Sequence, residues 1–388
     1  MPEYKTKLSP HHMSGGSDTS KWLREARPSV LKCVGDFGPQ FDALPGTLVL
    51  GRMVDDGALD GQGADINRQS RNQTAAHAAD QYVQFLRDYI RLNPQVAIWE
   101  AYNEQNFEYD PVRENSDPMF RSAMQASRIR TMQWYAEFLY LFAQKLAQLG
   151  KRAALGGWAV GNPDRSLWVA YRRALDATRD FNAVLTRHEY GPLDGHLSLR
   201  YRSDQDHFTT MGYPNVPVII SECGGDNVPG SGPWRSFYGN NVSRYWNELL
   251  LPYTKAIELD SYVIGATVFT SGGAGWRDFD ITGSGLVDLV IQYANRVVTP
   301  PVIVPPVVTP PPVPPAVPAG MHKVTATVLN VRAHPWTGIT VPTLVRQLPK
   351  DSLVRVMGTY KTAGMQFGWA SLSNNSNEWV SMQYLVPA

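Results

Sequence analysis

The 388-residue sequence predicts an α/β fold: a (β/α)8 TIM barrel, then a proline-rich linker, then a small all-β barrel. Three observations predict this order. Eight short apolar runs alternate with longer amphipathic segments over roughly the first 290 residues. Prolines then recur every few residues with no charge between them, and short β-type runs separated by Gly, Asn, Pro and Ser follow. We therefore expect domains at 1–296 and 321–388, joined by a linker at 297–320.

Each expected barrel strand is a short apolar run that closes in polar residues. The strands are predicted at Lys7 to Met13, Val30 to Gly35, Thr47 to Met53, Val96 to Tyr102, Arg152 to Val160, Ala183 to Tyr190, Val216 to Cys223 and Tyr262 to Thr270. Helical periodicity is clearest in Ala78 to Leu92, Ser127 to Leu149, Leu167 to Thr178, Val242 to Glu258 and Leu286 to Val297. An open doubly wound sheet is the rival interpretation, but no glycine-rich phosphate loop follows the first strand.

The stretch from Val297 to Gly320 alternates prolines with valines. Proline lacks the amide donor and fixes φ, so this stretch cannot join a helix or a central strand. We expect a semi-rigid polyproline spacer, up to about 70 Å long at about 3.1 Å per residue. A plain tether is the simplest interpretation, and a docking site for a proline-binding partner is the alternative.

Composition excludes several classes of function. Lys plus Arg (36) nearly cancels Asp plus Glu (35), so the net charge of +1 gives no support for nucleic acid or a membrane surface as a partner. The two cysteines, Cys33 and Cys223, are too few for a disulfide framework and lack metal-ligand spacing. The first residues resemble no signal peptide, and no apolar stretch is long enough to span a membrane. We expect a soluble product whose leader, if it is secreted, has been removed.

Polar residues at the carboxyl ends of the predicted strands matter most, because the active site of a parallel barrel lies there. The fourth strand closes as WEAYNEQ, with Glu104, and the seventh closes as ISECGG, with Glu222. A carboxylate at such a place is costly to desolvate unless it has partners, and that cost shifts its pKa. Two carboxylates facing each other across the barrel mouth are what hydrolysis of a glycosidic bond requires. Structural ion pairs are the alternative for both.

These strand ends resemble clan A of the glycoside hydrolases, the retaining (β/α)8 enzymes that include cellulases and glucanases. The Asn103-Glu104 pair resembles the clan's strand-four signature, Glu222 its strand-seven pattern, and His188-x-Tyr190 its strand-six pattern. The resemblance implies that Glu104 is the acid/base, Glu222 the nucleophile and Asn103 a donor to the hydroxyl beside the anomeric carbon. It also implies that His188 and Tyr190 line the sugar site and that the tyrosine orients the nucleophile. Gln105 stands where many members have proline, and Cys223 where many have an aromatic residue.

Other strand ends supply further candidates for substrate binding. Arg52 ends the third strand and could hold Glu222 ionised. Trp158 and Trp276, after the fifth and eighth strands, offer flat faces that could stack on sugar rings. His11 and His12 end the first strand; either could line a sugar subsite, and we assign His12 there.

Neighbouring positions receive structural assignments. Adjacent histidines point to opposite faces of a strand, so His11 and His12 do not form the two-histidine metal site of an amidohydrolase, and we expect no metal and no cofactor. Alternation predicts that Glu100 points inward with a structural role and that Glu189 faces the helices. Cys223 should be a small core residue rather than a reactive thiol.

Residues 323–388 resemble a bacterial SH3-like domain in the VLNVR run near its start, LPKD at a turn and EWVSMQYL at its end. Such domains often bind cell-wall peptides or glycans, so the resemblance implies a targeting module that raises the local substrate concentration through the tether. A purely structural or protein-docking module is the alternative.

Together these residues predict a monomeric retaining glycoside hydrolase that cleaves β-linked polysaccharide or oligosaccharide by double displacement, with carboxyl groups about 5 to 5.5 Å apart. We expect it to be extracellular or associated with a cell wall. Two alternatives stay open: a barrel that binds carbohydrate or cell wall without turnover, and a lytic hydrolase directed at peptidoglycan.

Overall fold

The chain is described from a computed structural model. The structure describes residues 4–54, 65–193, 197–296, 321–325, 328–332, 344–356, 358–360, 369–372 and 378–387. The chain divides into two compact units, Met1–Val297 and Val298–Ala388. The linker predicted at 297–320 lies outside the described residues.

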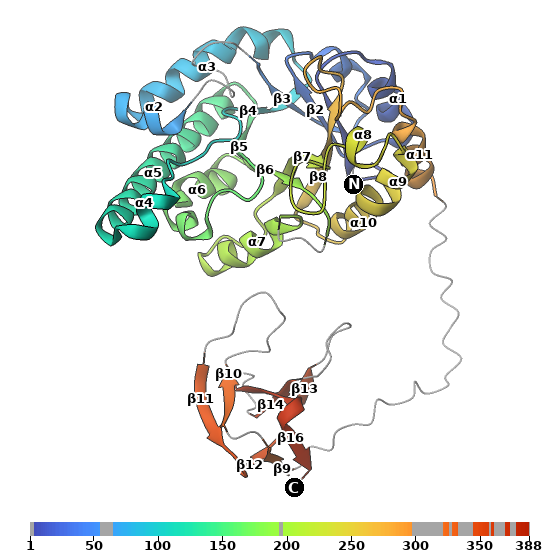
Figure 1. The fold of residues 1–388 in the computed structure, drawn as a ribbon. Helices are drawn as coiled ribbons and strands as arrows, with labels where there is room; N and C mark the ends of the chain where they lie inside the picture. Colours follow the sequence, from blue (N-terminus) through green and yellow to red (C-terminus); the bar gives the residue numbers. More distant parts are fainter. Residues whose placement is uncertain are drawn as a thin grey trace. The chain divides into compact units, whose positions relative to one another are not determined.

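The first unit is built on eight parallel strands that close into a barrel in sequence order, so the predicted (β/α)8 barrel is confirmed (Figure 1). Closure joins the first strand to the last, with Leu8 opposite Ala266 and Pro10 opposite Val268. The strands are β1 (Leu8–His12), β2 (Val30–Val34), β3 (Leu48–Arg52), β4 (Val96–Glu100), β5 (Arg152–Trp158), β6 (Val184–Tyr190), β7 (Val218–Gly224) and β8 (Val263–Ser271).

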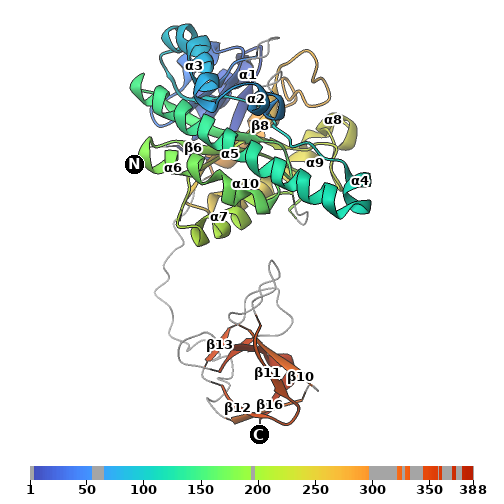
Figure 2. The same cartoon turned by 90° about the vertical axis from the view of Figure 1, so that its left-hand side faces the viewer.

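Helices surround the barrel, and the longest, α5 (Pro118–Gln148), runs along its side (Figure 2). Helix α5 begins with Pro118 at its first turn, and the Asp117 side chain accepts a hydrogen bond from the Phe120 amide. The other helices are α1 (Ser17–Ala26), α2 (Ile66–Asn72), α3 (Ala75–Leu92), α4 (Pro111–Ser116), α6 (Arg172–Asp180), α7 (Arg200–Thr210), α8 (Trp234–Phe237), α9 (Val242–Tyr245), α10 (Leu251–Glu258) and α11 (Leu286–Ala294). Short helical turns are η1 (Gly38–Asp42), η2 (Arg165–Tyr171) and η3 (Trp246–Leu250). No helix among the described residues combines the length and the apolar character needed to cross a membrane.

The apolar residues form one large core between the strands and the helices and a small plug inside the barrel. The large core includes a run of stacked and edge-on aromatic rings between β4, α3 and α5, among them Tyr82, Tyr102, Tyr135 and Phe138. The plug consists of one inward residue from each of six strands: Val30, Leu50, Ile98, Ala154, Val184 and Ile219. Because side chains alternate along a strand, the residue two positions after each plug residue also points inward, nearer the carboxyl ends.

The second unit contains two antiparallel sheets. One has the strand order β11-β10-β15-β14-β13 and the other the order β12-β9-β16. Their bounds are β9 (Met321–Val324), β10 (Val328–Arg332), β11 (Leu344–Pro349), β12 (Leu353–Arg355), β13 (Gly358–Tyr360), β14 (Trp369–Ser371), β15 (Trp379–Ser381) and β16 (Leu385–Pro387). Buried Val324, Val331, Val354, Ala370 and Val380 belong to its core. The all-β character matches the expectation, and the SH3-like assignment stays a prediction.

Candidate active site

A cavity of about 110 Å³ opens at the carboxyl ends of the barrel strands. Its lining brings together four of the predicted site residues with Glu104 and Glu222. The lining residues are Met13, Arg52, Asn103, Glu104, Tyr190, Glu222, Asp226, Phe269, Trp276 and Phe279. The position matches the rule that barrel active sites lie at this end.

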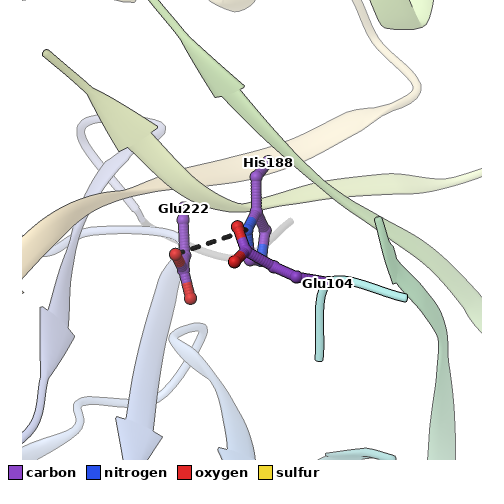
Figure 3. Close-up of side chains that lie close together, drawn as sticks. All are labelled: Glu104, His188 and Glu222. Carbon is purple, nitrogen blue, oxygen red and sulfur yellow. Dashed lines mark hydrogen bonds and ion pairs between the residues drawn. The ribbon is translucent and has the colours of Figure 1, made fainter. Parts of the chain in front are cut away.

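The two predicted catalytic carboxylates lie beside each other with His188 between them (Figure 3). Nδ1 of His188 is 2.8 Å from Oε1 of Glu104 and 3.3 Å from Oε2 of Glu222. One oxygen of Glu104 and one of Glu222 lie within 4.8 Å of each other. Among the described residues, this trio also has donor atoms close enough together to hold a metal ion.

Glu104 and Glu222 differ in their access to solvent. The side chain of Glu104 is 45% exposed and that of Glu222 is 6% exposed. Glu104 follows β4 with a φ of 49°, and its amide donates to the carbonyl of Gly157 at 2.8 Å, which ties the end of β4 to the end of β5. Glu104 can therefore exchange protons with water, whereas Glu222 is enclosed by protein.

Cations and fixed donors converge on Glu222. Its Oε1 lies 3.2 Å from Nζ of Lys32, 3.5 Å from Nε2 of His11 and 3.7 Å from Nη2 of Arg52. Its Oε2 accepts a hydrogen bond from the Tyr190 hydroxyl at 2.9 Å. Burial alone would raise the pKa of Glu222, but the charges of His188 and Lys32 outweigh it and hold that pKa well below its usual range. Glu222 is therefore ionised at neutral pH.

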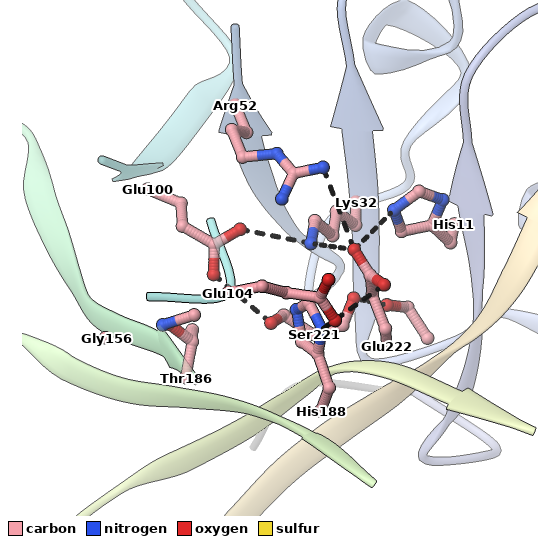
Figure 4. Close-up of polar contacts among 12 residues, drawn as sticks. His11, Lys32, Arg52, Glu100, Glu104, Gly156, Thr186, His188, Ser221 and Glu222 are labelled. Atoms are coloured by element: carbon pink, nitrogen blue, oxygen red, sulfur yellow. Dashed lines mark hydrogen bonds and ion pairs between the residues drawn. The ribbon is translucent and has the colours of Figure 1, made fainter. Parts of the chain in front are cut away.

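A third carboxylate, Glu100, lies deeper in the barrel (Figure 4). Oε2 of Glu100 is 3.0 Å from Nζ of Lys32, and its Oε1 accepts from the Ser221 hydroxyl at 3.2 Å. Glu100 and Lys32 are fully buried. Burial opposes ionisation, but Lys32 and then Arg52 lower the pKa of Glu100 to about 2. Glu100 thus points inward, as expected, and is paired with Lys32, which the pattern of polar strand ends did not indicate.

Strand alternation explains most of this cluster. Lys32, Arg52 and Glu100 each stand two residues after a plug residue, so they share its inward direction. Glu222 comes directly after Ser221, yet both side chains point inward. The reason is that the pairing of β7 with β6 shifts between the Arg187–Ile220 and His188–Glu222 pairs. This bulge turns two consecutive side chains of β7 toward the barrel interior. Lys32 was detectable in the sequence as the only charge inside the apolar run VLKCV.

Two side chains that line the cavity carry buried polar atoms without a hydrogen-bond partner among the described residues. Nε and Nη1 of Arg52 and Oδ1 of Asn103 have no hydrogen-bond partner among the described residues, although both side chains are buried. Trp276 is 42% exposed and meets Phe269 and Phe279 edge-on. The cavity lining thus combines polar side chains with an aromatic wall, a combination that suits a sugar ring.

Two predicted site residues lie elsewhere. His12 points outward, where Nδ1 is 3.1 Å from the Thr19 hydroxyl and Nε2 is 3.1 Å from Asp36. Of the two β1 histidines, His11 is the one that reaches Glu222, and its other nitrogen lies 3.1 Å from the Thr270 hydroxyl. Burial lowers the pKa of His11 to about 4, so it is neutral at neutral pH.

Trp158 is also not part of the cavity. It is fully buried among Tyr135, Trp168 and Tyr171, and has no free face for a sugar. The physical reason is the backbone before it: Gly156 and Gly157 have φ of 119° and 57°, and the pairing of β5 with β6 shifts there. The alternation breaks, and the indole turns toward the helices.

The neighbours of the catalytic candidates lie as expected. Cys223 is fully buried in the large core between the strands and the helices. Glu189 points toward the helices, where its carboxylate accepts from the amides of Leu199 and Tyr201 and from the Tyr253 hydroxyl, each at 2.9 Å.

A larger cavity of about 610 Å³ lies between the loops that follow β4 and β5. It is lined by Asn106, Phe107, Tyr109, Gln125, Arg128, Asn162, Asp164, Ser166 and Leu167. Tyr109 is 68% exposed, and the Arg128 guanidinium lies 5.2 Å from the centre of its ring. Asn106 in its lining stands two residues after Glu104 in the sequence.

No protein-family model matches the sequence, and no curated protein matches it. The solved structures that it resembles include glycoside hydrolases. One is a family GH128 endo-β-1,3-glucanase from Amycolatopsis mediterranei bound to laminaritriose, with 12% identity over 74% of this chain and 99% of that chain and a TM-score of 0.38. Others are the catalytic domain of a mannanase from Streptomyces sp. SirexAA-E (15% identity, 68% and 74% of the chains, TM-score 0.36) and a β-glucuronidase from Ruminococcus gnavus (13%, 74% and 51%, TM-score 0.42).

Proposed function

We propose that this chain is a glycoside hydrolase that cleaves β-glycosidic bonds of an oligosaccharide or polysaccharide with retention of anomeric configuration. One observation carries the proposal: an exposed carboxyl, Glu104, and a buried, ionised one, Glu222, present oxygens within 4.8 Å of each other at the barrel mouth. Retaining enzymes hold their carboxyl groups about 5 to 5.5 Å apart, whereas inverting enzymes need about 6.5 to 9.5 Å to admit a water molecule. A contact this close between the nearest oxygens suits the retaining arrangement, in which no water molecule stands between the nucleophile and the sugar.

In the first step, Glu222 attacks the anomeric carbon while Glu104 donates its proton to the glycosidic oxygen. The bond from the anomeric carbon to that oxygen breaks, a bond to the Glu222 carboxylate forms, and the leaving sugar departs as a neutral alcohol. The different surroundings of the two carboxyls fit these roles, because the nucleophile must be ionised and the acid must be able to take up a new proton from solvent.

In the second step, Glu104 acts as a base. It removes a proton from a water molecule, the water oxygen attacks the anomeric carbon, and the bond to Glu222 breaks to return the carboxylate. His188 contacts both carboxyl groups and holds them in position relative to each other through both steps.

Other residues of the cavity bind and orient. The Tyr190 hydroxyl fixes one oxygen of Glu222, and burial followed by the charge of Glu222 raises the pKa of Tyr190, which keeps that hydroxyl a donor. Asn103 and Arg52 line the cavity and supply polar side chains for sugar hydroxyls. Trp276 supplies the apolar wall.

The larger cavity extends the proposed substrate. Glu104 protonates the leaving oxygen, so the sugars that leave lie on its side, and the loop that carries Glu104 continues into the cavity of about 610 Å³. Exposed Tyr109 and the amides of Asn106 and Asn162 suit neutral sugar units there. We therefore propose that the substrate is a chain with several units on the leaving side.

A panel of β-glucans, mannans, xylans and chitin, with product analysis by proton NMR, tests the proposal. We expect reducing ends from one substrate class and a first-formed product with the β configuration. A product with inverted configuration would contradict the mechanism, and the absence of any released sugar would contradict the activity.

A second candidate is a hydrolase or binding protein that acts at a cell wall, which the small β-rich second unit favours. In that case the protein is extracellular, and the second unit binds the wall. Purified cell walls distinguish the three outcomes: clearing indicates lytic action, sedimentation with the walls without clearing indicates binding alone, and neither indicates another substrate.

A further inference from the structure

Lys32 and Glu100 form a buried ion pair directly behind Glu222, although two-carboxylate chemistry needs neither of them. Nζ of Lys32 lies 3.0 Å from Oε2 of Glu100 and 3.2 Å from Oε1 of Glu222. The side chains of Lys32 and Glu100 are 0% exposed, and that of Glu222 is 6% exposed. The lysine is therefore shared between two carboxylates that water does not screen.

The pair is costly to bury, so its presence asks for a reason. An isolated charge is strongly destabilised in a dry interior, and replacing a buried ion pair by apolar residues is often neutral or stabilising. If this part of the barrel interior served stability alone, we would expect apolar side chains here, as in the plug. Instead, Lys32 and Glu100 stand two residues after the plug residues Val30 and Ile98, between the plug and the cavity.

The reaction supplies a reason, and this step rests on the proposed function. Before the reaction, Lys32 and Arg52 balance the negative charges of Glu100 and Glu222. When Glu222 becomes an ester, it loses its charge, and a lysine that served Glu222 alone would be left buried without a partner. Glu100 remains ionised beside it, and the Ser221 hydroxyl fixes Glu100 from the adjoining position of β7.

We propose that Lys32 is a positioning residue that holds Glu222 ionised before attack, and that Glu100 is the counter-charge that keeps Lys32 paired while Glu222 is esterified. The pair thus stabilises the site in both charge states of the nucleophile. Without Glu100, the covalent intermediate would leave an unpaired ammonium in the barrel.

Other charged or titratable groups also face Glu222 and must be included in any test. They are His11 from β1, Arg52 from β3, Glu104 after β4, His188 and Tyr190 from β6, and Asp226 after β7. Among these, only Arg52 is a permanent cation, and it lies farther from Glu222 than Lys32 does. Nζ of Lys32 is thus the basic nitrogen nearest to Glu222 among the described residues.

The first test measures the titration of Glu222 itself, in the full chain with ¹³C-labelled glutamate carboxyls, with the signal assigned by its loss in Glu222→Gln. In Lys32→Met we expect the titration midpoint of Glu222 to rise by at least about one pH unit, tenfold in proton concentration. Lys7→Met is the matched control: Lys7 is also buried, but its ammonium binds the carbonyls of Ile257 and Asp260, and the midpoint should not move.

Lys32→Met leaves Glu100 unpaired and could fail to fold, which near-ultraviolet circular dichroism reports. Lys32→Met/Glu100→Gln removes both charges and is the second variant. Its Glu222 midpoint should lie above that of the wild type and below that of Lys32→Met. The reason is that the attraction of Glu222 to Lys32 and its weaker repulsion by Glu100 are lost together. A midpoint at or below that of the wild type in the folded variants would overturn the role of Lys32.

The second test is a double-mutant cycle on kcat/KM for an activated aryl β-glycoside. Glu100→Gln should lower kcat/KM by about tenfold or more when Lys32 is present, and much less in the Lys32→Met background. Equal effects in both backgrounds would overturn the role of Glu100. If the wild type hydrolyses no glycoside but the midpoint moves as expected, the proposed function fails and the electrostatic role of Lys32 stands. If hydrolysis occurs and the midpoint does not move, the function stands and this inference fails.

Discussion

Two buried clusters, each made of one basic and two acidic side chains, lie on the two sides of the barrel wall. They differ in the pKa values of their carboxyl groups. The inner cluster, Lys32, Glu100 and Glu222, lines the interior below the cavity. The outer cluster, Arg187, Glu189 and Asp204, lies between β6 and the helices, where Arg187 pairs with both acids. All six side chains are almost completely buried.

Burial raises the pKa of Glu189, although Arg187 opposes the rise. The same effect on Glu100 and Glu222 is outweighed by cations, so the pKa values of both are lowered. Glu189 has both oxygens occupied by neutral backbone and hydroxyl donors, whereas Glu222 is reached by Lys32, Arg52 and the cavity. A buried carboxylate is thus no sign of catalysis by itself; several cations together with access to a cavity are.

The largest expected effect separates the two clusters by activity. Glu222→Gln should lower kcat by roughly 10³-fold or more, because no nucleophile remains. Glu189→Gln should keep near wild-type activity and cost about 1 to 3 kcal/mol of unfolding free energy, because it disturbs satisfied hydrogen bonds. Activity assays with denaturant unfolding of both variants check this. Equal loss of activity in both would break the comparison.

The exposed carboxyl at the cavity comes next. Glu104→Gln should lower turnover of a natural glycoside by about 10² to 10⁴-fold, because protonation of the leaving oxygen is lost. A dinitrophenyl glycoside needs no such proton, so its first step should be much less affected. The ratio of the two rates in the variant and the wild type is the measurement, and an identical loss on both substrates would contradict the acid role.

The pH dependence of stability should have opposite signs for the two clusters. The pKa of Glu100 is about 2 in the folded chain against an ordinary 4.5, so its contribution is full above about pH 4.5 and is lost as the pH falls toward 2. This amounts to about 3 kcal/mol. For Glu189 the pKa is raised, so the wild type loses stability as the pH rises from its ordinary pKa through the folded one.

Unfolding free energies of Glu100→Gln and Glu189→Gln across this range provide the measurement. The fall in unfolding free energy toward pH 2 should be smaller in Glu100→Gln alone. The fall in unfolding free energy on raising the pH should be smaller in Glu189→Gln alone. The same pH profile in both variants would show that the clusters do not differ electrostatically.

The smallest effect concerns the second cavity. Tyr109→Ala should raise KM for a long chain by about tenfold or less, because one aromatic contact is worth about 0.5 to 1.5 kcal/mol. Its kinetics on a short aryl glycoside should not change. Phe41→Ala, which removes another exposed aromatic ring, is the control. A loss on both substrates would place Tyr109 in the folding of the loop rather than in binding.

Much of the barrel was predictable because each of its strands is a short apolar run with polar ends. Helices α1 and α7 were missed, since Ser17–Ala26 and Arg200–Thr210 carry few apolar residues. The pairing of a carboxylate at the end of β4 with one at the end of β7 was also predictable, because parallel strands bring these ends together.

The finer details of the site depend on breaks in alternation that one sequence does not reveal. The glycine pair before Trp158 turns the indole out of the mouth, and the bulge at Ser221 turns Glu222 in. For β1, alternation separates His11 from His12 but does not say which one points inward. Lys32 lies inside a strand rather than among the polar residues at its end, and only the packed barrel shows that it meets Glu222.

The most direct test of the account traps the covalent intermediate. An activated 2-deoxy-2-fluoro glycoside of the sugar that the panel identifies is incubated with the full chain, and the digest is analysed by mass spectrometry. The account predicts one stoichiometric label, on the peptide that contains Glu222, and none in Glu222→Gln. A label on another residue, or rapid hydrolysis of the natural substrate with no label under any condition, would contradict it.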